Sequence, residues 1–425
     1  MRKSAKKAAA ACRPAGKQPL AQGAGDGAHV LYVSSFLAQA TYDRLLRDAP
    51  YPPSQATQKY NALLTAGLVH AGAQVTALSA PPLSCRTCGR RFVRLKRERS
   101  EGVSFCYLPV VNLPVLKQLV TWICAFFSTL RHLRPGTHVL CYGLIVSACG
   151  GARAAARLKG CPAGVIVSDM PEELGGGRAM RLAARELTRY DGYVLLTEAM
   201  NGRVNPHGRP FLVVEGQADA NLAARENALR DKHLERVCLY AGMLHARYGI
   251  LRLVEAFLRM DAADARLVIY GTGDARAAIE AAAKKDARIQ YRGVKDNANV
   301  VAEELRATLL VNPRPSDEAF TRFSFPSKNL EYMASGTPVL TTRLPGMPPE
   351  YRDYVYLFEG ETPEAMAQTL TEVLKLPREE LHEKGLAAKA FVLAQKSNNA
   401  QARRILDFMG TLALRPRGDR PCNPA

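Results

Sequence analysis

The sequence has few acidic and few aromatic residues. Asp and Glu number 39 against 58 Lys and Arg, which gives a net charge of +19, and tryptophan occurs once in 425 residues. Aromatic side chains make up 7% and do not follow the repeated pattern of a base-stacking surface. The basic runs lie only near the start and in one loop, so we expect no nucleic-acid partner, although the charge alone would allow one.

A signal-like apolar stretch and a cysteine framework are also missing. Residues 1–26 are rich in Ala, Gly, Lys and Arg, and we expect a disordered basic arm there. Ten cysteines at irregular positions favour reduced thiols and a cytoplasmic protein over a secreted disulfide scaffold. Cys85 and Cys88 have zinc-ligand spacing, but no second pair follows, so two thiols in a basic loop are the favoured interpretation and no metal is predicted.

The composition is otherwise that of a folded, multi-domain protein. Hydrophobic residues make up 47% and charged residues 23%, which excludes global disorder. Residues 1–225 carry 29 basic and 13 acidic side chains, so most of the excess charge lies in the first half. Such a field favours anionic partners, including phosphate-bearing substrates and an acidic membrane surface.

Short apolar runs alternate with helix-like or polar segments, which predicts an α/β fold with two doubly wound units. We expect a disordered arm (1–26), a first Rossmann-like domain (27–225), a second (226–398), a C-terminal helix (399–414) and a disordered tail (415–425). The predicted strands of the first domain are 29–35, 74–80, 137–143, 163–169 and 191–197. Those of the second are 237–243, 266–273, 289–294, 307–314, 337–342 and 354–360.

The segment 113–133 is apolar but short for a membrane-spanning helix. With Trp122 and the flanking Lys117, Arg131 and Arg134 it suits a membrane interface. A helix packed on the first sheet is the alternative. The nearby basic run 90–99 would add attraction to anionic lipid.

The most polar loop follows the predicted strand 307–314 and extends to about residue 326, and a helix follows it up to Gly336. We predict Ser324 as the N-cap of that helix and Pro326 in its first turn, so that the amides of Phe325, Ser327 and Lys328 face outward and attract phosphate. Glu331 lies one turn further, where its carboxylate can accept hydrogen bonds from a sugar diol. This spacing fits a nucleoside diphosphate, although Glu331 alone is also consistent with a solvated helix carboxylate.

The same segment, VNPRPSDEAFTRFSFPSKNLEYMASGTPVLTTRLPGMPPEY, resembles the nucleotide-sugar-binding part of family 4 retaining glycosyltransferases, and especially a bacterial subgroup that builds exopolysaccharides and other cell-surface glycans. YAGMLHARYGILRLVEAF and RLVIYGTGD resemble the preceding elements of that family. In the first domain, PPSQATQKYNALLTAGLVHAGAQVTALS, IVSDMPEEL and LLTEAMNGRV resemble the same subgroup. The resemblance runs from Ala28 to Gly410.

The resemblance implies a GT-B fold, with two Rossmann-like domains facing a cleft, and sugar transfer with retention. It also implies that Glu331 binds the nucleotide ribose, Ser327 and Lys328 the diphosphate, and Arg247 the diphosphate from across the cleft. Gly242 begins the corresponding loop after the first strand of the second domain. Gly271 and Gly273 would let the backbone approach the nucleotide, or would simply form a strand-to-helix turn.

Two positions depart from the family pattern. Phe323 stands where the first glutamate of a paired motif is expected, and Met243 stands where a cation is usual. Phe323 cannot accept a hydroxyl hydrogen bond, so other groups, such as Asp317, Glu318 or Arg322, would have to hold the donor sugar.

The expected chemistry is stabilisation of charge as the bond from the sugar to the diphosphate breaks. Arg247 and Lys328 would stabilise the leaving group, with no metal and no cofactor. Asp169 would position the acceptor or take its proton, or would cap a turn. Gln58 and Asn61 are weaker candidates for cleft contacts and are equally consistent with exposed helix residues.

The predicted function is therefore sugar transfer from a nucleotide-diphosphate sugar to a glycan or polyprenyl-linked acceptor, in the cytoplasm or on the inner face of the membrane. Because Phe323 and Met243 replace polar groups, a catalytically degenerate partner-binding module remains open. A nucleotide-sugar epimerase also remains open, whereas a phosphorylase would need a pyridoxal-linked lysine context that the sequence does not offer.

Overall fold

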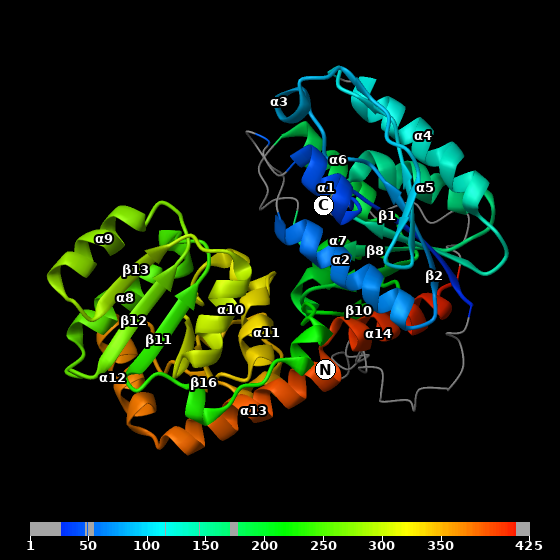
Figure 1. Cartoon of the computed structure of the whole chain (residues 1–425). Coiled ribbons are helices and arrows are strands. Elements are labelled where there is room, and N and C mark those ends of the chain that lie inside the picture. Colours follow the sequence, from blue (N-terminus) through cyan, green and yellow to red (C-terminus); the bar gives the residue numbers. More distant parts are fainter. Residues whose placement is uncertain are drawn as a thin grey trace, which may run out of the picture.

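The computed structural model describes residues 27–46, 49, 55–114, 116–143, 145–170 and 177–413. The predicted arm 1–26 and tail 415–425 lie outside these residues. The described chain forms two main sheets in two lobes, and α13 leads from one lobe toward α14 in the other (Figure 1).

The first lobe contains an eight-stranded sheet of order β10-β9-β8-β7-β1-β2-β5-β4, in which only the β4–β5 pair is antiparallel. Its strands are β1 (His29–Ser34), β2 (Gln74–Ser79), β4 (Glu98–Ser100), β5 (Val103–Tyr107), β7 (Thr137–Tyr142), β8 (Ala163–Val167), β9 (Gly192–Leu195) and β10 (Phe211–Val213). β3 (Phe92–Val93) and β6 (Val110–Val111) form a separate antiparallel pair. The helices are α1 (Gln39–Leu46), α2 (Gln55–His70), α3 (Cys85–Cys88), α4 (Leu116–His132), α5 (Val146–Leu158), α6 (Arg178–Leu187) and α7 (Asn201–Val204), with a 3-10 turn, η2, at Glu198–Met200.

The second lobe contains a parallel six-stranded sheet of order β13-β12-β11-β14-β15-β16. Its strands are β11 (Arg236–Ala241), β12 (Ala265–Tyr270), β13 (Ile289–Gly293), β14 (Leu309–Asn312), β15 (Val339–Thr341) and β16 (Tyr356–Leu357). The helices are α8 (Ile250–Arg259), α9 (Arg276–Lys285), α10 (Asn297–Arg306), α11 (Ser327–Ser335), α12 (Pro363–Lys375) and α13 (Arg378–Gln395). The 3-10 turns are η3 (Ala220–Ala224), η4 (Leu229–Asp231), η5 (Ala246–Tyr248), η6 (Ala319–Arg322) and η7 (Pro349–Tyr354).

Both sheets are covered on both faces, which explains why their central strands are continuous apolar runs. In β1, Val30 and Tyr32 belong to a core shared with α2 and α14, whereas Leu31 and Val33 belong to one shared with α5. The second sheet has α8, α9 and α12 on one face and α11 and α13 on the other. All eleven strands predicted from the sequence are confirmed.

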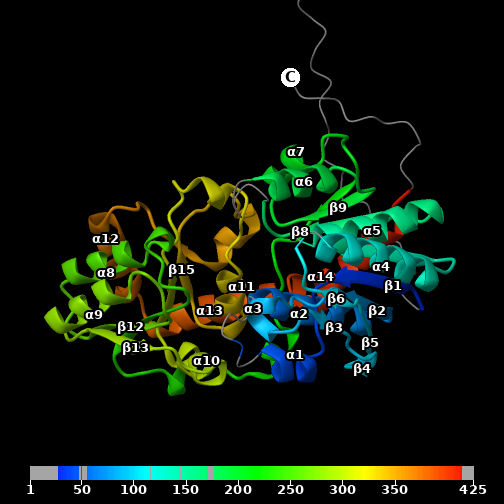
Figure 2. The ribbon, with the colours of Figure 1, turned by 90° about the horizontal axis from the view of Figure 1, so that it is seen from above.

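The C-terminal helix α14 (Asn398–Gly410) packs on the first lobe although it follows the second in sequence (Figures 1 and 2). A Cβ at Gly67 of α2 would overlap the carbonyl oxygen of Asn398, so this glycine allows the two helices to approach closely. The chain thus crosses between the lobes twice. The two crossing segments pair with each other through a parallel bridge between Ala218 and Ser397.

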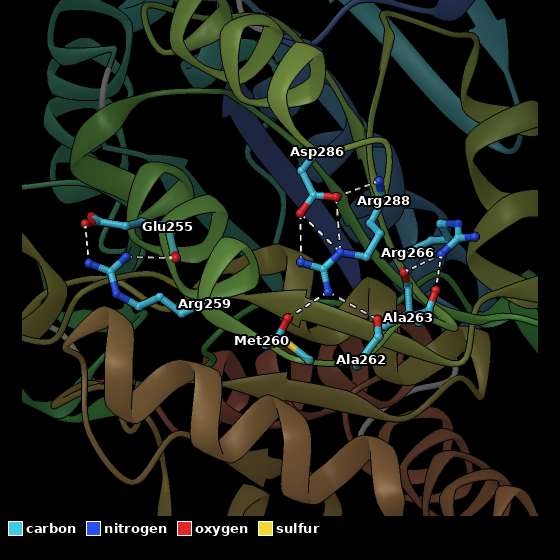
Figure 3. A network of polar contacts seen from close by, with 9 residues as sticks. Glu255, Arg259, Met260, Ala262, Ala263, Arg266, Asp286 and Arg288 are labelled. Carbon is cyan, nitrogen blue, oxygen red and sulfur yellow. Dashed lines mark hydrogen bonds and ion pairs between the residues drawn. The ribbon is translucent and has the colours of Figure 1, made fainter.

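A polar network fixes the outer edge of the second lobe (Figure 3). The Arg288 guanidinium pairs with Asp286 at 2.7 Å and donates to the carbonyl oxygens of Met260 at 2.7 Å and Ala262 at 3.2 Å. The hydrogen bond from Arg288 lowers the pKa of Asp286 despite partial burial. This contact joins the end of α8 to the start of β13 on the side away from the first lobe.

Candidate functional site

The strand order of the second sheet indicates which of its edges is the candidate ligand-binding site. β11 is followed outward by β12 and β13 on one side, whereas β14, β15 and β16 extend on the other. The direction of chain progression therefore reverses between β11 and β14, and in open α/β sheets ligands bind at the carboxyl ends of the strands at such a point. The loops concerned are 242–249 after β11 and 313–326 after β14.

Glycines allow the loops at this edge to pack together. Gly249 has φ +82°, and a Cβ there would overlap the carbonyl oxygen of Pro313. Gly271 has φ +132°, and a Cβ would overlap the carbonyl oxygen of Gly242; one at Gly273 would overlap Leu244. The close approach that the structure describes at Gly271 and Gly273 is thus to protein backbone, and a contact with nucleotide stays a prediction.

Helix α11 begins later than the sequence suggests. Its N-cap is Pro326 rather than Ser324, and the Ser324 hydroxyl is buried with no hydrogen-bond partner among the described residues. Phe325 precedes this N-cap, so the prediction that its amide belongs to the first turn is corrected. Its side chain is 5% exposed and packs on Tyr351 in the core. Ser327 and Lys328 do lie in the first turn, and Gly336 ends the helix in a left-handed conformation, as predicted.

Tyr332 ties α11 to the end of β11. Its hydroxyl lies 2.8 Å from the amide nitrogen of Ala241, which donates to it, and donates to the carbonyl oxygen of Ala241 at 3.1 Å. Gly242 follows directly. The first turn of α11 and the loop after β11 are therefore held at one edge.

Glu331 forms two ion pairs, one of them between the lobes. Its Oε1 lies 2.7 Å from Lys59 Nζ on α2, and its Oε2 lies 2.9 Å from Lys328 Nζ. Burial would raise the pKa of Glu331, but the charges of Lys328 and Lys59 outweigh it and lower the pKa. Burial likewise opposes the charge of Lys328, whose pKa is nevertheless raised by Glu331 and Glu304. Glu331 is an ionised, paired carboxylate, unlike the solvated one that the sequence left open.

Lys59 is a site residue that sequence reasoning missed. It lies in a predicted helix among polar residues, 272 positions from Glu331, and no local pattern marks it. The contact depends on how the two lobes meet, which neither helix specifies alone.

Arg247 lies in η5 with its guanidinium carbon 4.2 Å from the centre of the Phe320 ring. No salt bridge of Arg247 occurs within the described part of the chain. Among the described residues, the charge of this cation therefore has no carboxylate partner.

The two departures from the family pattern have different environments. Phe323 packs on the apolar core of the first lobe, and Arg203 stacks over its ring at 5.8 Å. It therefore contributes to the contact between the lobes, near the bond from Thr197 Oγ1 to the Arg322 carbonyl oxygen. Met243 is 55% exposed and contributes no charge.

In the first lobe, Asp169 follows β8 at the carboxyl edge of the sheet and is exposed. Its Oδ2 accepts a hydrogen bond of 2.8 Å from Ser168, whose hydroxyl lies 2.7 Å from that of Tyr142. This placement suits a group that meets an acceptor.

The interpretation of Asn61 as a cleft contact is corrected, whereas that of Gln58 stays a prediction. Asn61 is fully buried, accepts a short hydrogen bond from the Tyr32 hydroxyl and donates to the Thr57 carbonyl oxygen. Gln58 uses both ends of its amide on the backbone of Leu37. Both side chains fasten α2 to β1 and the loop that follows it, so neither is an exposed helix residue.

Neither a metal cluster nor a membrane span occurs within the described ranges. There, no group of three or more His, Cys, Asp or Glu residues could hold a metal ion. Cys85 and Cys88 thus have no third ligand of these types among those residues. No described helix has the length and apolar character to cross a bilayer.

The comparisons agree with this geometry. Residues 235–376 match the family described as "Glycosyl transferases group 1". Sucrose-phosphate synthase from Thermosynechococcus elongatus is 15% identical, with a TM-score of 0.60 over 89% of this chain and 97% of its own. Anabaena HepE in complex with UDP-glucose is 12% identical, with a TM-score of 0.58 over 89% and 99%.

A UDP-forming α,α-trehalose-phosphate synthase from Burkholderia xenovorans, in complex with glucose-6-phosphate, is 10% identical, with a TM-score of 0.62 over 90% and 100%. No curated protein sequence matches significantly. The fold is GT-B, as the resemblance implied. The second lobe, which carries Glu331, is the part that is similar to group 1 glycosyl transferases.

Proposed function

We propose that this protein is a retaining glycosyltransferase that takes a sugar from a nucleotide-diphosphate sugar. The observation that carries the proposal is the position of Glu331 on α11, with Lys328 beside it and the carboxyl ends of β11 and β14 adjacent. A carboxylate held ionised at this edge suits a ribose diol, and the first turn of α11 suits a phosphate. Structures with UDP and UDP-glucose on the same fold support this choice of donor class.

In the proposed reaction, the bond between the sugar and the diphosphate breaks while the acceptor oxygen attacks the same sugar carbon. Negative charge grows on the diphosphate and positive charge on the sugar ring. Lys328 and Arg247 would stabilise the diphosphate, without a metal ion, and fixed cations at a partly dry site are effective because they need no reorganisation. Asp169 would orient the acceptor hydroxyl or receive its proton.

The proposed acceptor is a glycan or a polyprenyl-linked saccharide of a cell-surface polysaccharide, used at the inner face of the membrane. Support comes from α4, which packs on α5 through Thr121, Ala125 and Thr129 and leaves an apolar stripe exposed. The stripe consists of Leu116, Leu119, Ile123 and Phe127. Together with the exposed basic residues of 91–99, joined to α4 through β3 and β6, it suits an anionic lipid surface.

The donor part is tested by thermal unfolding with UDP, GDP, ADP and their sugars. A ligand at 100 times its dissociation constant stabilises the folded state by about 2.7 kcal/mol. We expect one base to shift the midpoint of the wild type and not that of Glu331→Ala. Glu383→Ala, an exposed helix carboxylate of α13, is the matched control and should respond like the wild type.

If no nucleotide shifts the wild type, the transferase proposal fails. A shift that persists in Glu331→Ala would leave nucleotide binding intact but remove Glu331 from it. Product analysis by NMR then tests retention, because the anomeric configuration of the transferred sugar must equal that in the donor.

A further inference from the structure

Arg314 lies two residues beyond β14, at the same edge as Arg247, and was not singled out by the sequence. Its guanidinium carbon is 4.6 Å from the centre of the Tyr248 ring and 5.4 Å from that of Phe320. Arg247 stacks on the same two rings, at 5.9 Å from Tyr248 and 4.2 Å from Phe320. Two guanidinium groups are therefore held next to each other by two aromatic rings.

This arrangement keeps two like charges together, and no carboxylate forms an ion pair with either of them within the described residues. The Nε atom of Arg314 is buried and has no hydrogen-bond partner, and no salt bridge of Arg314 occurs within the described residues. Burial, together with the charge of Arg247, lowers the pKa of Arg314, although Tyr248 and Tyr240 oppose the shift. A buried donor without a partner is costly, and so is a pair of cations.

Three of the carboxylates near these loops, those of Asp274, Asp317 and Glu361, have other partners. Asp274 lies 3.0 Å from His245, and Asp317 lies 3.3 Å from Arg252. Glu361 accepts a bond of 2.9 Å from the Ser316 amide. Within the described residues, these three acids therefore do not neutralise Arg247 and Arg314.

We infer that Arg314 binds the diphosphate of the donor alongside Arg247 and supplies the positive charge that Met243 does not. This inference rests on the proposed function and deepens it. Tyr240 connects the positions of Met243 and Arg314. Its hydroxyl donates to the Met243 carbonyl oxygen at 2.9 Å, and Tyr240 is also close enough to Arg314 to affect its pKa. A guanidinium can bind phosphate oxygens through two parallel hydrogen bonds, which a lysine cannot.

The test compares a nucleoside diphosphate with its nucleoside by calorimetry or ligand-observed NMR, using the base selected above, in Arg314→Met and the wild type. We expect Arg314→Met to weaken diphosphate binding about 10- to 100-fold, the range for a charged hydrogen bond, and to leave nucleoside binding within about twofold. Arg403→Met removes an equal charge from the exposed surface of α14 and is expected to change neither affinity.

Unchanged diphosphate affinity in Arg314→Met overturns the inference. Equal losses for diphosphate and nucleoside also overturn it, because they would mean that Arg314 only holds the loop. If Arg314→Met does not fold, Arg314→Lys gives the same comparison while it keeps the charge. We expect its affinity for the diphosphate to fall about 3- to 10-fold.

Pyrophosphate, which has no ribose, separates this inference from the proposed role of Glu331. It should stabilise the wild type and Glu331→Ala alike, and Arg314→Met less. If Glu331→Ala keeps nucleotide binding while Arg314→Met loses the pyrophosphate effect, the ribose assignment fails and the Arg314 assignment stands. If pyrophosphate stabilises Arg314→Met as it does the wild type, the Arg314 assignment fails, whatever Glu331 does.

Discussion

Glu304 on α10 is a buried acid whose pKa is affected by the charge of Glu331. It is 4% exposed, and burial raises its pKa to about 7. Lys328 and Lys59 oppose this rise, whereas the like charge of Glu331 adds to it. The carboxyl group therefore changes charge near neutral pH, beside a carboxylate that stays ionised.

The pH dependence of stability follows from the sign of this shift. The folded-state pKa is raised above the reference value of 4.5, so the group favours folding below about pH 4.5, and that contribution is lost as pH rises through about 7. Glu304→Gln removes the titration. We expect the variant and the wild type to differ little near pH 4.5 and the variant to be more stable at pH 8, by on the order of 2 to 3 kcal/mol at most.

Thermal melts from pH 4.5 to 8.5 measure this difference. Glu379→Gln, at an exposed position of α13, controls for the loss of one carboxylate and should differ from the wild type by a nearly constant amount. A pH-independent difference for Glu304→Gln would contradict the prediction.

At the residue scale, the sequence indicated which polar residues could be functional, but it did not indicate which residues they contact. Glu331 was found because a carboxylate one turn after a phosphate-binding helix start is a local pattern. Asn61 was misassigned because its partner, Tyr32, is 29 residues away on β1, and a polar residue in a helix does not reveal that its amide is buried. The role of Arg314 could not be predicted, because its stacking on Tyr248 depends on the close approach of two loops at Gly249 and Pro313.

At the scale of single elements, α4 packs on α5 in the first lobe, whereas its membrane contact stays a prediction. One face carries small residues and allows close contact with α5, where a Cβ at Gly151 would overlap the Trp122 carbonyl oxygen. The other face leaves Phe127 65% exposed. Contact with α5 and an apolar outer surface are compatible because a helix has room for two different stripes.

Replacing the outer stripe tests its proposed role. The double change Ile123→Glu and Phe127→Glu removes exposed apolar area and adds repulsion from anionic lipid. We expect sedimentation with anionic liposomes at low salt to fall at least about tenfold, because each large side chain contributes about 1.5 to 3 kcal/mol when fully buried. Leu234→Glu, at the 95% exposed residue before β11, should leave sedimentation unchanged. If the wild type itself does not sediment, a soluble acceptor is preferred.

Continuous apolar runs made the parallel strands predictable, since strands buried on both faces lack alternation. The hairpin β4–β5 was missed because its outer strand reads as a basic loop. Its turn uses Glu101 at φ +50° and Gly102 at φ +78°, a two-residue connection that only the structure reveals.

At the scale of the whole molecule, two of the contacts that join the lobes contain ion pairs. At the crossing segments, Lys396 is buried and pairs with Glu215, which also accepts a 2.8 Å hydrogen bond from Tyr351. At the candidate site, Lys59 and Glu331 form a more exposed pair. The first contact lies where the chain passes between the lobes, whereas the second lies where a donor is proposed to bind.

The Lys59–Glu331 pair places ligand binding and lobe contact in competition. Each carboxylate oxygen of Glu331 is engaged by one lysine, so we expect a ribose diol that bonds to both oxygens to compete with Lys59 for Oε1. Lys59→Met keeps the length of the side chain and frees Oε1. A pair of this exposure contributes about 0.5 to 1 kcal/mol, so we expect nucleoside binding to tighten about two- to fivefold. Diphosphate binding should gain less, because a nearby cation is lost as well.

Calorimetry on Lys59→Met and on Lys295→Met, an exposed lysine after β13, measures both effects. Weaker nucleoside binding in Lys59→Met alone would mean that Lys59 contacts the ligand instead of competing with it.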